Sequence, residues 1–178
     1  MTVSGFLSEI TIRKKPGHSS KGLLTFGDQT VPCALGRNGM GPIKQEGNGV
    51  TPIMTTRMLY GFYRPDREKR PLSAVPFHPM HEDMGWCDEA EHRCYNQLVS
   101  LPFDASHETM WRDDPLYDLV IVLDINIAPR AKRRGSAIFM HVAREGFMPT
   151  EGCIALQKSD LRRLLGWMSP ATRIHIAR

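Results

Sequence analysis

A histidine and a cysteine twelve residues apart carry the most reactive chemistry that the sequence offers. His141 lies in an expected strand, and Cys153 follows the tripeptide Thr-Glu-Gly in a loop. A cysteine becomes a nucleophile when a nearby imidazole takes its proton and when donors await the negative charge on the substrate carbonyl. Gly152 lets substrate approach the backbone, and the N–H groups of residues 152 and 153 can serve as those donors. Many cysteines after glycine are buried structural thiols, so spacing alone leaves both interpretations open.

Other polar and aromatic residues are candidates for the walls of a substrate cleft. Arg144, three residues past His141, can bind a substrate carboxylate, and a solvated surface arginine fits this position equally well. Trp111 and Trp86 stand near acidic residues in segments with little periodicity, where they can line the cleft or belong to the core. The same two interpretations hold for the polar-tipped residues Tyr95, Asn96 and Asn126.

A proline-rich segment from 64 to 97 contains a second group of reactive side chains, which are His78, His81, Cys87, His92 and Cys94. We expect a long ordered loop or insertion that forms one wall of the cleft, since long loops inside a domain are usually functional. The spacing H-x2-H-x5-C-x4-H-x-C lacks paired C-x2-C and matches no zinc pattern, so zinc is a weak alternative. Cys87 and Cys94 can form a disulfide in an oxidising compartment, although we favour free thiols.

The elements that position these residues are mostly strands. Fifteen glycines and thirteen prolines divide the chain at short intervals, a pattern typical of short strands joined by turns. Apolar runs and alternation predict strands at 7–14, 22–26, 29–35, 58–63, 118–126, 136–143 and 172–177. One helix is predicted near the C-terminus, with Ser159 as its N-cap, because four residues recur at helical spacing, namely Leu161, Leu164, Leu165 and Met168.

Length and composition describe a single domain over residues 1–178. The chain has 23 basic and 19 acidic residues, a net charge of +4, and 41% hydrophobic residues, which exclude a disordered protein or a long coiled coil. The longest aliphatic run, Leu119 to Leu123, is far shorter than the roughly 20 residues of a membrane span, and no secretory signal is visible. A pI near 9.0 raises nucleic-acid binding as an alternative. No aromatic-basic alternation and no helix-turn-helix support it, so we expect no nucleic-acid partner.

The chain resembles the YkuD-type L,D-transpeptidases. Their signature is a His, a loop, and then Ser/Thr-His-Gly-Cys followed by an apolar residue and Asn or Arg, and it is matched here by His141, Thr150, Gly152, Cys153 and Ile154. The similarity continues through the loop Ala-Leu-Gly-Arg-Asn-Gly-Met-Gly and a Gly-x-Thr-Pro turn at 49–52. Compact proteobacterial members are particularly similar, since they carry Thr-Glu-Gly-Cys, Gly-Trp-Cys-Asp and Tyr-Asn.

This resemblance implies a mostly β fold, a YkuD-type sandwich or mixed sheet with a few short helices, including one near the C-terminus. It implies a peptidoglycan enzyme of the cell envelope or periplasm that acts as a monomer without cofactor or metal. Cys153 would attack a donor stem peptide, with His141 as base and a backbone carbonyl orienting the imidazole. The thioester would pass to the side-chain amine of a diaminopimelate residue in an acceptor stem. Water as acceptor would instead give an amidase or carboxypeptidase, which the sequence does not distinguish.

Two departures from the family pattern bear on the substrate site. Glu151 stands where most members have His, and Ala155 stands where most have Asn or Arg. A carboxylate there can raise the pKa of the thiol, or it can bond a loop or contact the acceptor amine, and we favour the second role. We expect Thr150 and Glu151 at the substrate site. The altered pocket predicts a cross-link from L-Ala to diaminopimelate (1-3), in preference to one between two diaminopimelates (3-3).

Overall fold

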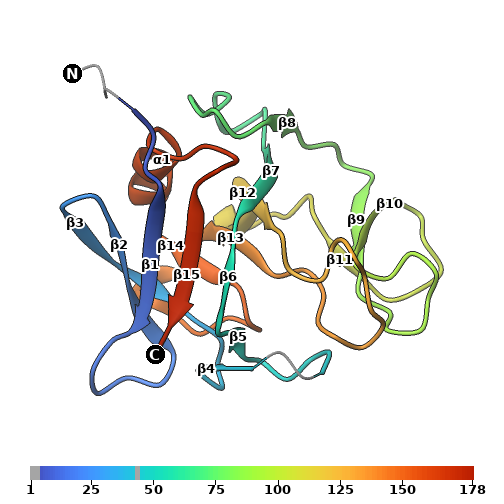
Figure 1. Ribbon diagram of the computed structural model, residues 1–178. Coiled ribbons are helices and arrows are strands. Elements are labelled where there is room, and N and C mark those ends of the chain that lie inside the picture. The colour runs from blue at the N-terminus through green and yellow to red at the C-terminus, as the bar shows by residue number, and fades with distance from the viewer. Residues whose placement is uncertain (1–4, 43–44) are drawn as a thin grey trace.

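The computed structural model describes residues 5–42 and 45–178. Within them, ten strands form one curled mixed sheet in the order β6-β15-β1-β2-β3-β14-β13-β12-β7-β8 (Figure 1). Their bounds are β1 (Glu9–Lys14), β2 (Lys21–Phe26), β3 (Gln29–Ala34), β6 (Met54–Thr56), β7 (Met58–Tyr63), β8 (Phe77–Pro79), β12 (Leu119–Leu123), β13 (Phe139–Val142), β14 (Ile154–Leu156) and β15 (Arg173–Ala177). This architecture confirms the mostly β fold with a mixed sheet.

Smaller elements complete the fold. Three strands, β10 (Gln97–Ser100), β9 (Met84–Cys87) and β11 (His107–Thr109), form a separate antiparallel sheet on the opposite side from β1 (Figure 1). A short pair joins β4 (Met40–Gly41) to β5 (Thr51–Pro52), and the helical elements are η1 (Pro115–Tyr117), η2 (Glu145–Phe147) and α1 (Lys158–Leu165). None of the helices in the described ranges is long and apolar enough to cross a membrane.

Seven predicted strands match observed ones: β1, β2, β3, β7, β12, β13 and β15. The ends of several lie one to three residues inside the predicted ranges, where the chain turns before its apolar pattern ends. The segment 64–97 is not a continuous loop, because it contains β8 and β9 and reaches the start of β10. These strands form through pairing with distant segments. They are too short for an alternating pattern of apolar and polar residues to predict them.

Strand β12 divides the hydrophobic interior into two parts. All five of its residues are buried, as expected for the continuous apolar sequence Leu-Val-Ile-Val-Leu. Leu119, Ile121 and Leu123 pack with the core between the sheet and α1. Val120 and Val122 face the other way and pack with Phe139, Trp86 and Tyr117, among others. The second core is the one that surrounds Cys153.

Helix α1 covers the first core with its apolar face. Leu161, Leu164 and Leu165 are fully buried, which confirms the predicted helix, whereas the equally buried Met168 lies beyond its end at Leu165. The predicted N-cap is wrong, because Gln157 is the N-cap and Ser159 lies inside the first turn. The physical reason is that β14 ends at Leu156 and the helix begins almost at once, before the chain reaches Ser159.

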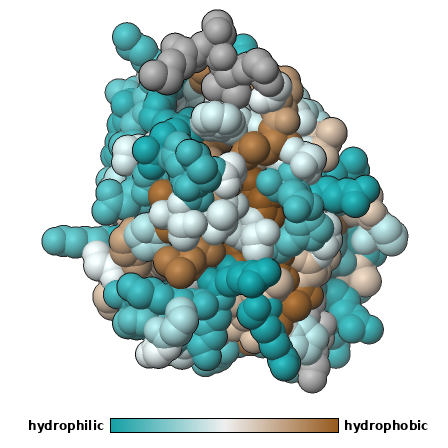
Figure 2. Space-filling model, turned by 60° about the vertical axis from the view of Figure 1, so that its left-hand side comes forward, coloured by the Kyte–Doolittle hydropathy of each residue, from teal (hydrophilic) through white to brown (hydrophobic). Residues whose placement is uncertain are grey.

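The surface on the β1 to β3 side of the molecule shows hydrophobic residues in several separate areas between hydrophilic ones (Figure 2). Four large hydrophobic residues of the described chain are exposed, at Phe6, Leu72, Leu98 and Met148. They lie far apart in the sequence, and scattered exposed apolar residues of this kind are ordinary on protein surfaces. We therefore look for function in the concave part of the molecule.

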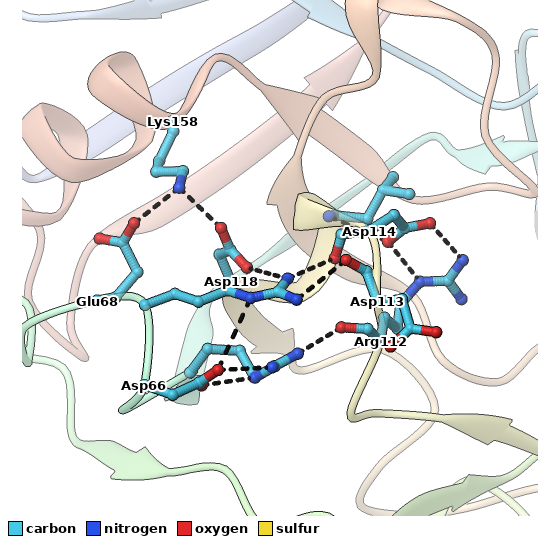
Figure 3. A network of polar contacts seen from close by, with 10 residues as sticks. Asp66, Glu68, Arg112, Asp113, Asp114, Asp118 and Lys158 are labelled. Atoms are coloured by element: carbon cyan, nitrogen blue, oxygen red, sulfur yellow. Dashed lines mark hydrogen bonds and ion pairs between the residues drawn. The ribbon is translucent and has the colours of Figure 1, made fainter.

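A network of ion pairs fastens the segment before β12 to α1 (Figure 3). The buried carboxylate of Asp118 lies 2.7 Å from Lys158 Nζ and 3.2 Å from Arg67 Nη1. Lys158 also binds Glu68 at 2.7 Å, and Arg67 donates to two backbone carbonyls at 113–114. Asp118 therefore joins the helix, the segment after β7 and the segment that carries η1.

We predict that Asp118→Asn destabilises the protein by about 2–3 kcal/mol, because it removes one charge from a desolvated network with two cationic partners. Asp160→Asn is the matched control, since Asp160 pairs with the half-exposed Arg163 at 2.6 Å and should cost less than about 1 kcal/mol. Urea unfolding followed by circular dichroism measures both. Equal losses in the two variants would contradict a special role for Asp118.

Candidate active site

A cavity of about 350 Å³ opens beside the junction of β13 and β14, and His141 and Cys153 both line it. The two strands pair in parallel, with Met140 opposite Ile154 and His141 opposite Ala155. Cys153 lies immediately before β14, so the register places it level with Phe139, two residues along β13 from His141. Side chains two residues apart on a strand point to the same face. Residues twelve apart in the sequence thus meet at one cavity.

Cys153 is held as a protonated thiol. Its side chain is buried, its Sγ–H donates to the carbonyl of Ala137 at 3.1 Å, and the Phe139 N–H lies 3.4 Å from the sulfur. Burial raises the pKa of Cys153 to about 12, since a thiolate is costly to desolvate, and the nearby carboxylate of Glu108 acts in the same direction. Cys153 therefore rests as the neutral thiol.

His141 is held as a neutral imidazole. Its Nδ1 lies 2.8 Å from the carbonyl oxygen of Val142. A carbonyl oxygen accepts hydrogen bonds, so we assign the proton to Nδ1, which leaves Nε2 as the base. Burial, together with the cations Arg112 and Arg144, lowers the pKa of His141 to about 4. At neutral pH the imidazole is uncharged and able to accept a proton.

The wall opposite the thiol is built from Glu108, Arg112 and Tyr117. The ring of Tyr117 meets that of His141 edge to face at 5.3 Å, and its hydroxyl donates to Glu108 at 2.9 Å. The Arg112 guanidinium lies 5.2 Å from the centre of the Tyr117 ring. Sequence reasoning missed all three residues. The dipeptide Asp114-Pro115 was the one sequence signal for η1. Asp114 is the N-cap and its side chain accepts from the Leu116 N–H, and Pro115 is the first residue of η1.

A buried hydroxyl fixes the loop that carries Cys153. Thr51, in the Gly-x-Thr-Pro turn, is fully buried and donates to the Gly152 carbonyl at 3.0 Å, while it accepts from the Gly36 N–H at 2.8 Å. Gly152 has a φ of 133°, a conformation that other residues rarely adopt. A Cβ at this position would lie 3.0 Å from the carbonyl oxygen of Val50. The residue before Cys153 must therefore be glycine.

Thr150 organises the same loop from within. Its hydroxyl donates to the Cys153 carbonyl at 2.6 Å and accepts from the Gly152 N–H at 3.2 Å. That bond occupies a donor that the sequence suggested for an oxyanion hole. The Gly152 N–H can bind an oxyanion once the Thr150 hydroxyl moves away. The Cys153 N–H is the other donor expected for the oxyanion.

Arg144, Glu151 and Ala155 line the cavity, as the sequence suggested. Arg144 is exposed at the start of η2. Glu151 is exposed and forms an ion pair with Arg37 of the glycine-rich loop. This ion pair is the bond to a loop that the sequence favours, together with a contact to the acceptor amine, over an effect on the thiol, and it places a carboxylate at the rim.

The other proposed wall residues lie outside the cavity lining. Trp111 stacks under the guanidinium of Arg64, 3.7 Å from the ring centre. Trp86, Tyr95 and Asn96 are buried, and the Trp86 Nε1–H donates to Asn96 at 2.9 Å. The polar tips of these three residues are satisfied inside the protein, since the Tyr95 hydroxyl donates to Glu46 and the Asn96 amide donates to the Asn126 carbonyl.

The segment 64–97 contributes one residue to the cavity lining, Asp88. Cys87 and Cys94 are free thiols, and His92 lies between them, with its Nδ1 3.9 Å from Cys87 Sγ and 3.1 Å from the Cys94 N–H. His78 and His81 lie elsewhere, beside a shallow groove with Tyr60. The described residues contain no group of three His, Cys, Asp or Glu arranged to hold a metal ion.

Comparison with protein-family models gives one match, to the YkuD family, described as an L,D-transpeptidase catalytic domain, over residues 21–176. The matched range covers nearly the whole chain and includes His141, Cys153 and the turn that contains Thr51. No curated protein and no solved structure matched in the corresponding searches.

The lowered pKa of His141 predicts a loss of stability in acid. The histidine of the unfolded chain has its ordinary pKa of 6.5, whereas the native imidazole has a pKa of about 4. Between these two pH values the unfolded chain binds a proton that the native protein does not bind. Stability is therefore complete above pH 6.5 and falls as the pH drops toward 4, by up to ~1.4 kcal/mol per unit.

His141→Asn should remove this dependence, which urea unfolding at pH 7.5, 5.5 and 4.5 would measure. The control is His175→Asn, because His175 is partly exposed on β15 and pairs with Thr55 and Glu9. Parallel curves for the wild type and His141→Asn would contradict the buried neutral imidazole.

Proposed function

Because the chain belongs to the YkuD family of L,D-transpeptidase catalytic domains, we propose that it transfers an acyl group between peptidoglycan stem peptides through a Cys153 thioester. One observation carries this proposal. A thiol and a neutral imidazole with a free Nε2 line one cavity, and a backbone carbonyl orients the imidazole. This arrangement supplies the nucleophile and the base that acyl transfer needs.

The first half-reaction follows from these positions. As the donor carbonyl enters, the Cys153 Sγ–H turns from Ala137 to His141 Nε2, and the sulfur attacks the carbonyl carbon. Negative charge develops on the carbonyl oxygen beside the Cys153 N–H. The imidazolium then gives its proton to the leaving amine, the C–N bond breaks, and the thioester remains.

The second half-reaction uses the same imidazole. The side-chain amine of diaminopimelate in a neighbouring stem attacks the thioester, and His141 takes the proton that the amine loses. The new amide forms as the sulfur leaves and recovers a proton from His141. Water in place of the amine would give hydrolysis, and no contact among the described residues favours that alternative.

The charges around the cavity suit a substrate with both signs. Arg112 and Arg144 can bind carboxylates, whereas Asp88, Glu108 and Glu151 can bind amines. Stem peptides that contain diaminopimelate carry both groups. We infer that the enzyme works in the cell envelope, where this polymer lies, and that neither nucleic acid nor a metal takes part.

We predict that Cys153→Ala lowers turnover by more than about 10³-fold without unfolding the protein, because no other group supplies the nucleophile. Cys94→Ser is the matched control, since Cys94 is a free thiol outside the cavity lining, and it should keep the rate within about twofold. Purified disaccharide peptides with product analysis by mass provide the assay. Turnover by Cys153→Ala would refute the assignment.

We also predict the 1-3 cross-link. The carboxylate of Glu151, fixed by Arg37, and the small apolar Ala155 should bind the charged carboxylates of a diaminopimelate donor less well than the family's usual residues. Expression in a bacterium that lacks its own L,D-transpeptidases, followed by muropeptide analysis, tests this. Dimers with a donor truncated to L-Ala support the prediction, whereas tripeptide donors alone indicate a 3-3 link.

A further inference from the structure

Asn96 uses all of its side-chain hydrogen-bonding groups inside the protein. Its Oδ1 accepts from the Trp86 Nε1–H at 2.9 Å and from the Ala137 N–H at 3.0 Å. Its Nδ2 donates to the carbonyls of Asn126 at 2.8 Å and Ile125 at 3.3 Å. The residue is 2% exposed and has a φ of 55°, a backbone conformation that asparagine tolerates better than most residues.

Ala137, whose N–H donates to Asn96, is also the residue whose carbonyl contacts Cys153. Ala137 also has a positive φ, of 50°, which is unfavourable for alanine and persists when its surroundings fix it. Its carbonyl is the acceptor for the Cys153 thiol at 3.1 Å. A single chain of hydrogen bonds therefore runs from Trp86 through Asn96 and Ala137 to the sulfur.

We propose that Asn96 is a positioning residue that fixes the Ala137 backbone, so that the Ala137 carbonyl holds the Cys153 thiol in its resting orientation. The inference rests on the proposed role of Cys153. It gives a role to the Gly-Trp-Cys-Asp and Tyr-Asn segments, whose Trp86 and Asn96 do not line the cavity themselves but reach its lining through the Ala137 N–H.

No shorter or charged side chain reproduces these contacts. The amide offers one oxygen that accepts twice and one nitrogen that donates twice, and all four positions are used. Aspartate would place a charge there and would present oxygen to the carbonyls of residues 125 and 126. Glycine keeps the positive φ and removes the side chain, so Asn96→Gly isolates the effect of the bonds.

Asn96→Gly should change the thiol and the turnover in opposite directions. Loss of a fixed acceptor frees the Cys153 thiol, so its alkylation by iodoacetamide at pH 8 should rise about fivefold, the factor for one hydrogen bond of ordinary strength. Misplacement of the sulfur should lower kcat about 10- to 100-fold, with KM within about twofold. Peptide mass mapping reads Cys153 and the fully buried Cys33 separately. Unchanged alkylation of Cys33 shows that the fold is intact.

Asn126→Gly is the matched control. Asn126 also has a positive φ, and its side chain makes three bonds to residues 131 and 135 of the same loop without touching Ala137. It should keep both the alkylation rate and kcat within about twofold. Equal effects from the two variants would show general loosening of the loop and overturn the proposal, as would wild-type behaviour of Asn96→Gly.

Trp86→Phe keeps the aromatic packing on Phe139 and removes one donor to Asn96, so it gives an intermediate result if Asn96→Gly does not fold. Wild-type alkylation and kcat in this variant would then overturn the proposal. Alkylation of Cys153 needs no turnover. A failure of the proposed function, seen as activity in Cys153→Ala, is therefore distinct from a failure of this inference.

Discussion

The burial of a thiol and an imidazole in one hydrophobic core is the constraint on which the site depends. Away from water both groups remain neutral, because charge on either would have to be desolvated. Each neutral group still needs a hydrogen-bond partner, and both partners are backbone carbonyls, at Ala137 for the sulfur and at Val142 for the ring. A backbone carbonyl adds no charge, so the pair stays poised without a third ionisable group.

Backbone carbonyls can orient the thiol and the imidazole only if the backbone itself is fixed. Buried side chains from distant segments fix it through hydrogen bonds. Thr51 ties the nucleophile loop to the glycine-rich loop, and Asn96 ties the residues before β13 to the small sheet. The ion pairs of Asp118 secure the wall that includes Tyr117 against α1 (Figure 3). Strand β12 contributes side chains to both hydrophobic cores. Close packing in both cores therefore resists movement of the cavity walls.

The parts of this arrangement that were readable from the sequence are those with a local signal. The five-residue apolar run predicted β12, helical spacing predicted α1, and residue type with spacing picked out His141 and Cys153. Glu108 and Tyr117 were not readable, because they meet through the approach of β11 to η1 and no period links them. Asn96 was noticed for its polarity and assigned to the cleft, whereas its polar atoms are all satisfied internally.

Under the proposed acyl transfer, the neutral pair also determines when the chemistry can begin. Because the pKa of the thiol lies well above that of the imidazole, transfer of the proton before substrate arrives is strongly uphill. The transfer becomes favourable when the sulfur can share its electrons with a carbonyl carbon whose oxygen is met by a donor N–H. Deprotonation and carbon–sulfur bond formation are then linked. A donor peptide that fits the cavity poorly would fail to activate the nucleophile, so recognition of the donor and activation of Cys153 are one event.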